Sequence, residues 1–398
     1  MKAKLSVLSC MLVAAGLASP LVQAQEKVKI GFVNEMKRLY ADVDGKNGAI
    51  AMQMAIEDFG GKALGQPIEF MSADHQNKAD IAASKMREWI DTQNISLVFS
   101  GTNSGTALAV SQVANEKKRV HFNNGAGSSA LTNEQCTPYT VHYVYDTVAL
   151  AKGTGGAVVD RGGKDWFFLT ADYAFGQALE SDTTKVINAK GGKVLGSVKH
   201  PLNASDFSSF LLQAQNSKAH ILGLANAGGD TINAIKAAKE FGINKTMKTA
   251  GLLVFLTDIH SLGLKNTEGL LHTTSWYWDM NDESRKFANK FFAKTKRMPT
   301  DVQAGNYSAV MTYLKAVEAV KTTNPDKVMA YLKSTPINDF YGKGVIRPDG
   351  TFAHDMYLVE AKKPSESTKP WDYLKVLNKL PADTVWTTKA ETKCALWK

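Results

Sequence analysis

The sequence predicts an α/β fold made of two doubly wound lobes, each built on a parallel sheet. First, short apolar runs alternate with segments of helical periodicity from Lys27 onward, which is typical of parallel strands joined by helices. Second, the pattern restarts near Asp165, so the second half of the chain repeats the α/β unit of the first. Third, 398 residues exceed the roughly 250 to 300 at which a single hydrophobic core stops growing.

In the first half, four apolar runs are expected to form strands and three amphipathic segments to form helices. The segment Gly48 to Phe59 shows the helical periodicity, because Ala51, Met52, Ala55 and Ile56 recur at helical spacing. The expected strands are VKIGFV (28–33), PIEFMSAD (67–74), ISLVFS (95–100) and RVHFNN (119–124), and the other helices are 78–92 and 104–117.

The second half repeats this order and then adds two more helices and a hairpin. The expected strands are DWFFLTAD (165–172), KVLGSVKHP (193–201) and HILGLANA (220–227), and the expected helices are 174–189, 204–215, 229–241, 282–295 and 303–321. The runs GVIRPDGTF (344–352) and DMYLVEAKK (355–363) are expected to form the hairpin, with Pro348-Asp349-Gly350 as its turn.

The late segments are expected to return to each lobe, so that several strands cross between them. We therefore assign residues 25–145 and 277–347 to the first lobe, and residues 146–276 and 348–398, with the C-terminal segment, to the second. Ligands of such folds bind at the carboxyl ends of the strands, and clefts between domains are preferred sites.

Residues 1–24 are expected to form a cleavable signal peptide. Lys2 and Lys4 precede an apolar run from Leu5 to Leu17, and Val22-Gln23-Ala24 matches a small-x-small cleavage site. A lipoprotein signal is the alternative, because Val7 to Cys10 resembles a lipobox, although most of the apolar run follows this cysteine. The mature chain is expected to be exported and soluble, since no later segment reaches the roughly 18 apolar residues of a membrane helix.

The composition argues against a nucleic-acid partner. Removal of the signal peptide leaves 374 residues and lowers the net charge from +9 to +7. The basic residues are scattered, with only short clusters such as Lys117-Lys118-Arg119, whereas nucleic-acid-binding domains concentrate them in a stripe or patch. A solvated cationic surface is the favoured interpretation.

Two cysteines, Cys136 and Cys394, remain after the signal peptide, and we expect them to form a disulfide. The alternatives are two separate buried thiols or one catalytic thiol. No CxxC motif and no His/Cys cluster with metal-ligand spacing occurs in the sequence, so neither a metal nor a cofactor is expected.

Two loops of small polar residues follow consecutive strands. Gly101-Thr-Asn-Ser-Gly105 lacks the Gly-Lys-Ser/Thr of a P-loop, but it places hydroxyls, an amide and a helix start together, which suits a carboxylate. A cap of the following helix by Asn103 or Ser104 is the simpler role, and one loop can do both. Gly125-Ala-Gly127-Ser-Ser-Ala130 fits G-x-G-x-x-A only weakly, because a loop sequence replaces the helix that a dinucleotide site requires.

No pattern of residues indicates catalysis. The sequence contains no G-x-S-x-G and no H-E-x-x-H motif, and its eight histidines are scattered singly. An enzyme stays an alternative at this stage, because catalytic triads are assembled in space.

Three segments resemble periplasmic solute-binding proteins of the leucine/isoleucine/valine type, the receptors of ABC importers. They are KIGFV with GAIAMQMAIEDFGG, LVFSGTNSGTALAVSQVANEKKRVHFNNGAGSSALT, and DWFFLTADYAFGQALE, and the resemblance extends from about Lys27 to about Phe352. It implies two Rossmann-like lobes joined by a multi-strand hinge (periplasmic binding protein type I), a periplasmic location, a monomer, and permease subunits as membrane partners.

The resemblance also implies where a ligand carboxylate binds. It would be held by the Thr102 to Gly105 loop and by main chain at Gly125 to Gly127. The serine and threonine that hold an α-amino acid in the family are changed near Asn103 and Gly127, and the acidic residue that pairs with the ligand ammonium is missing near Leu252 and Leu253. A buried ammonium without a counter-charge is costly, so an aromatic or apolar carboxylate is favoured over an α-amino acid.

Aromatic residues near the expected cleft agree with this ligand class. Tyr173 and Phe175 occupy the family's aromatic cleft position, while Tyr40 and Trp276 either contact the ligand or pack in the core. Lys37-Arg38 either attracts an anion or is a solvated pair. The expected ligand-binding residues are Tyr40, Thr102, Asn103, Ser104, Gly125, Ala126, Gly127, Tyr173, Phe175, Asn226, Leu252, Leu253 and Trp276.

The sequence therefore predicts a receptor that captures a small carboxylate, with an aromatic acid as the favoured ligand class, and delivers it to an ABC importer. A branched-chain amino-acid receptor, a ligand-sensing module without transport and a secreted enzyme are the alternatives.

Overall fold

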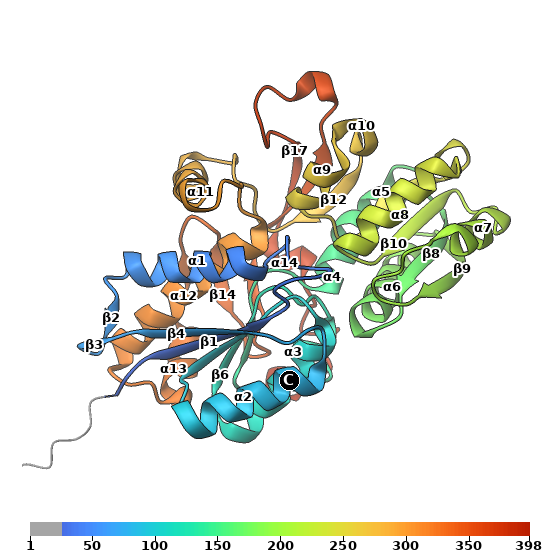
Figure 1. Cartoon of the computed structure of the whole chain (residues 1–398). Helices are drawn as coiled ribbons and strands as arrows, with labels where there is room; N and C mark the ends of the chain where they lie inside the picture. The colour runs from blue at the N-terminus through green and yellow to red at the C-terminus, as the bar shows by residue number, and fades with distance from the viewer. Residues whose placement is uncertain (1–25) are drawn as a thin grey trace, which may run out of the picture.

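The structure is a computed structural model and describes residues 26–398. The expected signal peptide lies outside the described residues. Figure 1 shows two α/β bodies side by side, with strands β1, β4 and β6 in one and β8, β9 and β10 in the other. The expected α/β class with two parallel sheets is confirmed.

The first sheet has five parallel strands in the order β4-β1-β5-β6-β7. The strands are β1 (Lys29–Asn34), β4 (Glu69–Asp74), β5 (Leu97–Ser100), β6 (Val120–Asn123) and β7 (Thr140–His142), and the helices that follow the first strands are α1 (Gly45–Asp58), α2 (Ala79–Gln93) and α3 (Ser104–Lys117). A small hairpin, β2 (Lys62–Ala63) and β3 (Gln66–Pro67), follows α1.

Both faces of this sheet are buried, which explains its continuous apolar strands. Phe32 of β1 joins the core with Met52 of α1. The next residue, Val33, points to the opposite face and packs with Met86 of α2. Alternation along one strand thus binds a helix layer to each side of the sheet.

The second sheet has four parallel strands in the order β11-β10-β8-β9. The strands are β8 (Asp165–Ala171), β9 (Lys193–His200), β10 (Ile221–Ala225) and β11 (Lys248–Gly251). Its helices are α6 (Ala174–Ala189), α7 (Ser208–Asn216), α8 (Gly229–Glu240), α9 (Leu256–Leu262) and α10 (Leu264–Thr267).

The chain passes from the first sheet to the second through α4 (Thr147–Leu150), a π-helical turn (Ala151–Gly155) and α5 (Gly156–Asp160). The π-helical turn packs closely on β12 (Leu271–Thr274), where the Thr154 and Thr273 hydroxyls lie 2.8 Å apart. A Cβ atom at Gly153 would lie 2.3 Å from Thr273 Oγ1, so this position has room only for glycine.

After β12 the chain returns to the first body through α11 (Asp282–Thr295), α12 (Asp301–Val320) and α13 (Pro325–Ser334). The remaining strands are β13 (Ile337–Asn338), β14 (Lys343–Ile346), β15 (Phe352–His354), β16 (Met356–Ala361) and β17 (Leu374–Leu380), and the last α-helix is α14 (Ala382–Val385). Strand β16 lies between β12 and β17 in an antiparallel sheet.

The expected hairpin needs one correction. Its turn at Pro348-Asp349-Gly350 is present, but it joins β14 to β15, and not to the run that begins at Asp355. The Met356–Ala361 strand pairs instead with β12 and β17. Strand β17, which the apolar pattern did not reveal, therefore shares the third sheet with β12.

The expected disulfide is present, since Cys136 and Cys394 are bonded. The C-terminal segment, which we assigned to the second lobe, is thereby joined covalently to a residue within the range assigned to the first. Our division of the chain between the lobes otherwise stays a prediction. None of the helices formed by residues 26–398 combines the length and the apolar character that crossing a bilayer requires.

The disulfide gives a first prediction. Chain released by removal of residues 1–24 should show no free thiol in denaturant without reductant, because its two cysteines are bonded. Reduction should lower the unfolding free energy by roughly 2–5 kcal/mol, since the bridge closes a long loop. Thiol titration and denaturant unfolding measure these quantities, and two thiols that react before reduction would contradict the bond.

Candidate functional site

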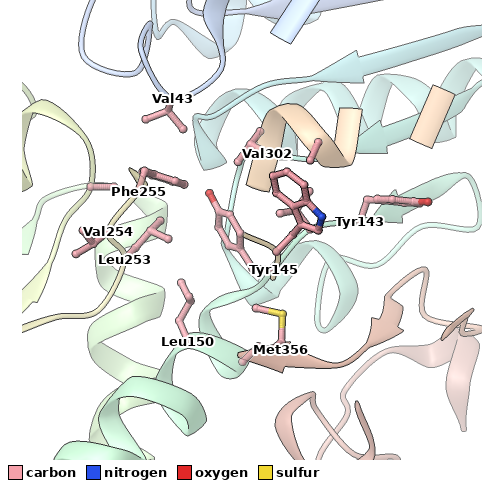
Figure 2. Close-up of a cluster of buried hydrophobic side chains, with 14 of the residues drawn as sticks. Val43, Tyr143, Tyr145, Leu150, Leu253, Val254, Phe255, Val302 and Met356 are labelled. Carbon is pink, nitrogen blue, oxygen red and sulfur yellow. The ribbon is translucent and has the colours of Figure 1, made fainter. Parts of the chain in front are cut away.

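A small cavity lies between the two bodies, at the carboxyl ends of their strands. It holds about 220 Å³ of empty space, including space that opens to solvent. Figure 2 shows four residues of this region, Val43, Tyr145, Leu253 and Phe255, in one apolar cluster. The full lining is Tyr40, Val43, Thr102, Gly125, Tyr145, Tyr173, Phe175, Ala227, Leu253 and Phe255. Only about 10 Å³ of this space admits a water-sized sphere, which is room for roughly one water molecule, so the lining side chains nearly fill the closed cavity and an organic ligand requires them to move apart.

Two tyrosines meet across the cavity. The Tyr40 hydroxyl, from the loop after β1, lies 2.6 Å from the Tyr173 hydroxyl, from the loop after β8. Burial raises the pKa of both phenols well above its ordinary value, so both stay protonated at neutral pH. Nearby, the Gly229 N–H donates to the Leu39 carbonyl at 3.3 Å, which adds a second bond between the bodies.

The loops after β5 and β6 touch each other on the first-body side of the cavity. A Cβ atom at Gly125 would lie 2.9 Å from Thr102 Cγ2 and 3.2 Å from its Cα, so the backbones approach closely only because Gly125 has no side chain. Asn34, at the end of β1, accepts hydrogen bonds from the Thr102 N–H at 3.0 Å and the Thr102 hydroxyl at 3.2 Å. Thr102 is therefore fixed from both sides.

The carbonyls of the Gly125 to Gly127 loop are all occupied. Tyr145 Oη donates to the Gly125 carbonyl at 2.7 Å, and the Thr147 N–H donates to the Gly127 carbonyl at 2.8 Å. The Ala126 carbonyl accepts from Asn123 Nδ2 at 2.6 Å and His142 Nε2 at 2.8 Å. Within residues 26–398, by contrast, the N–H groups of Gly125 and Gly127 have no acceptor. The loop therefore offers free N–H donors, whereas each of its three carbonyls already accepts a hydrogen bond.

Helix α3 begins beside these loops and brings further donors. Asn103 is its N-cap, and Asn103 Oδ1 accepts from the Thr106 N–H at 3.1 Å. Ser104 Oγ accepts from the Ser128 N–H at 3.1 Å, which ties the helix start to the loop after β6. The cap satisfies one N–H of the first turn, and the others have no partner within the helix. The positive end of the helix dipole adds to these donors.

No side chain that lines the cavity carries a formal charge, and five of the ten lining residues are aromatic. The second body contributes Tyr173, Phe175, Ala227, Leu253 and Phe255 to the lining, and none of them is acidic. The carboxylate of Asp230 is buried, accepts the N–H groups of Asn203 and Ala204 at 3.1 Å each, and does not line the cavity. The walls therefore favour an aromatic or apolar body.

The structure brings together about half of the expected site residues. Tyr40, Thr102, Gly125, Tyr173, Phe175 and Leu253 line the cavity. Gly127 lies behind the Phe175 and Tyr145 rings, since a Cβ there would be 2.8 Å and 3.1 Å from them. Asn103, Ser104, Ala126, Asn226, Leu252 and Trp276 are buried close to the cleft or in the core but are not part of the lining.

Two of the residues outside the lining have clear packing roles. Trp276 Nε1 donates to Ser284 Oγ at 3.0 Å, and its ring packs on Phe287. Asn226 Oδ1 accepts from the Thr231 hydroxyl at 2.7 Å, and its Nδ2 lies 3.1 Å from His200 Nε2. Trp276 thus serves the core, which was one of its two expected roles.

Four lining residues escaped the sequence analysis: Val43, Tyr145, Ala227 and Phe255. Ala227 is the last residue of the expected strand 220–227, so the position of strand exits is a signal for it, whereas Phe255 follows β11, which the sequence analysis did not predict. Arg38 lines a neighbouring groove that also contains Asp42 and Asp258, and Lys37 lines neither space.

A family model described as periplasmic binding protein matches residues 27–368. The chain belongs to this family of periplasmic binding proteins. A Leu/Ile/Val-binding protein homolog from Brucella melitensis is 25% identical over 86% of this chain and 89% of its own length. The expected type I periplasmic binding fold and the resemblance to Leu/Ile/Val-binding proteins are confirmed.

Solved structures agree with this assignment. A periplasmic binding protein from Burkholderia mallei is 65% identical, with a TM-score of 0.93, over 94% of this chain and 99% of that one. A branched-chain amino acid ABC transporter ligand-binding protein from Burkholderia xenovorans is 40% identical, with a TM-score of 0.84, over 94% and 100%. A Rhodopseudomonas palustris solute-binding protein in complex with 4-hydroxybenzoate shares the fold at 21% identity and a TM-score of 0.82, over 91% and 99%.

Membership of this family decides several general properties of our periplasmic binding protein. Such proteins bind small ligands, serve ABC transporters together with membrane permeases, and are not enzymes, so the prediction of a non-enzymatic receptor is confirmed at this level. Among residues 26–398, no group of three or more His, Cys, Asp or Glu residues is arranged to hold a metal ion.

The contact between Gly127 and the second body gives a prediction. Gly127→Val should push the Phe175 ring away and hold the two lobes apart, because even a Cβ there would lie 2.8 Å from that ring. The backbone of Gly127 does not have a positive φ, so lack of space is the expected cause. Small-angle X-ray scattering should give a larger radius of gyration than for the wild type.

Gly156→Ala is the matched control, because its Cβ would lie 3.3 Å from the flexible end of Lys190 and at an ordinary contact distance of 3.8 Å from Val186 Cγ1. This variant should leave the radius of gyration unchanged. A wild-type radius for Gly127→Val would contradict the closed contact.

Proposed function

We propose that this periplasmic binding protein captures a small aromatic carboxylate in the cavity between its lobes and delivers it to an ABC importer. Residues 1–24 direct export and are removed. The observation that carries the proposal is the lining of the cavity, which has five aromatic side chains and no charged one.

The carboxylate is held by main-chain donors on the first-lobe side. Thr102 and Gly125 line this side and α3 begins two residues after Thr102, so we assign the Gly125 N–H and the N–H groups of the first turn of α3 as the donors. Hydrogen bonds to a charged group each contribute about 1.5–3 kcal/mol, and the α3 dipole favours the anion further. A cationic side chain is not required, as in other anion sites at helix N-termini.

The aromatic ring of the ligand lies among Tyr145, Tyr173, Phe175 and Phe255, on the side of the cavity that faces the second lobe. Offset or edge-to-face contacts between aromatic rings contribute about 0.5–1.5 kcal/mol beyond the burial of their area. A solute-binding protein of the same fold in complex with 4-hydroxybenzoate supports this choice of ligand class.

A branched-chain amino acid is the alternative, and a relative that is 40% identical carries that description. It requires an acceptor for the ligand ammonium, and the cavity wall offers none with a negative charge. Burial of an unpaired ammonium costs several kcal/mol, which outweighs the contacts of an aliphatic side chain.

A thermal-shift screen tests the proposal. Benzoate and 4-hydroxybenzoate should raise the melting temperature, and at 100 times the dissociation constant the ligand adds about 2.7 kcal/mol of stability. Benzyl alcohol, which has the ring without the carboxylate, and leucine, isoleucine and valine should have little effect. Stabilisation by leucine at micromolar concentration, without a response to the aromatic acids, would overturn the proposal in favour of the amino-acid receptor.

A further inference from the structure

A chain of buried polar side chains lies directly behind the two loops of the first lobe. It runs from Thr102 through Asn34, Asp44 and Asn306 to Asn124, and none of these is more than 6% exposed. Its members come from five separate segments: the end of β1, the loops that follow β5 and β6, the residue before α1, and the second turn of α12. Four of the five do not line the cavity.

Each link of this chain is a hydrogen bond of normal length. Asn34 Nδ2 donates to Asp44 Oδ2 at 2.8 Å, and Asn306 Nδ2 donates to Asp44 Oδ1 at 2.7 Å. Asn124 Nδ2 donates to Asn306 Oδ1, also at 2.7 Å. Asp44 is therefore the final acceptor of two series of hydrogen bonds. One series starts at Thr102, and the other starts at Asn124, the residue before Gly125.

Asp44 makes these hydrogen bonds to Asn34 and Asn306 instead of capping helix α1. It is the N-cap of α1, where an aspartate normally accepts from the first-turn N–H groups, but its side chain makes no such bond. Burial raises the pKa of Asp44 to about 7, whereas the two amide donors lower it. The position thus carries an energetic cost that helix capping does not explain.

Two glycines show that the space around this chain is filled. A Cβ atom at Gly101 would lie 1.6 Å from Asn34 Oδ1, and one at Gly48 would lie 1.8 Å from Asp44 Oδ1. Asn34 Oδ1 also accepts from the Glu35 N–H at 2.8 Å, so its bonding capacity is fully used. The Asn34 amide and the Asp44 carboxylate therefore cannot change position unless the main chain also moves.

We infer that Asn34, Asp44 and Asn306 are positioning residues for the ligand site, which hold Thr102 and the Asn124–Gly125 turn at the spacing that the ligand requires. They act through the loops and do not contact the ligand. The inference rests on the proposed use of these loops for a carboxylate, but the loop positions themselves are measurable without any ligand.

Asp44→Asn is the first test. In the wild type, Asp44 accepts hydrogen bonds from both Asn34 and Asn306. The new amide at position 44 has only one oxygen, so its NH₂ group would face one of these two donors, and that hydrogen bond must break or the facing amide must flip. Benzoate affinity should fall about tenfold, the size expected for one buried hydrogen bond. The crystal structure without ligand should show the main chain displaced at Thr102 or at Gly125, with the sheet unchanged.

Asp44→Asn combined with Asn306→Asp is the rescue. In this double variant the amide at position 44 donates to the carboxylate at position 306, which also accepts from Asn124 Nδ2, and the amide oxygen accepts from Asn34 Nδ2. Every bond of the chain is restored with the charge moved by one residue. Benzoate affinity and both loop positions should return close to the wild type.

Tyr143→Phe is the matched control, because it removes a buried hydroxyl that bonds to Ser308 and Thr312 on α12. It should lower stability without changing affinity or loop positions. Equal affinity losses in this control and in Asp44→Asn, or wild-type loops in the Asp44→Asn crystal structure, would overturn the inference. If the wild type binds no aromatic acid, the proposed function fails, and the loop positions of the three variants still decide the positioning role.

Discussion

The hydrogen bond between the Tyr40 and Tyr173 hydroxyls, which lie 2.6 Å apart, joins the two lobes at the cavity, and the rest of the site depends on the closed arrangement in which this bond forms. Both residues follow the first strand of their parallel sheet, where the chain leaves the core and turns over the edge. The bond forms only if the two strand ends face each other. The same arrangement brings Phe175 against Gly127 and Tyr145 within 6.2 Å of Phe255, measured between ring centroids.

Closure places a neutral, aromatic cavity against main-chain donors. Because the carbonyls after β6 are occupied by Tyr145, His142, Asn123 and Thr147, the free groups on that loop are N–H donors. A site with spare donors, aromatic walls and no charged side chain favours an anion with a flat apolar body. These features are complementary to an aromatic carboxylate at both ends of the ligand.

The sequence predicted the parts of this account that depend on local pattern. The segments Ser104–Lys117, Ala174–Ala189 and Asp282–Thr295 are helices with the expected bounds, because amphipathic periodicity and caps are encoded within a few residues. Strand exits such as Thr102, Gly125 and Tyr173 were identified as well, since parallel topology brings the carboxyl ends of strands to one edge.

Contacts between distant segments could not be predicted in this way. Asn124 and Asn306 are 182 residues apart, and nothing in either local sequence indicates that they meet. Phe255 reaches the cavity and Leu252 does not, although they are neighbours in the same loop, because backbone direction decides which side chain faces inward. Trp276 was expected either at the cleft or in the core. Its ring packs on Phe287 of α11 and its ring N–H donates to the Ser284 hydroxyl of the same helix, and the sequence near Trp276 does not reveal these contacts.

The central claim is that main-chain donors, and no charged side chain, hold the acidic group of the ligand. A crystal structure of the protein with benzoate tests it most directly. We expect the carboxylate oxygens at about 2.7–3.2 Å from N–H groups of Gly125 and of the first turn of α3, with the ring between Tyr145 and Phe175. A carboxylate paired with Arg38 in the neighbouring groove, or a ring outside the aromatic walls, would contradict the account.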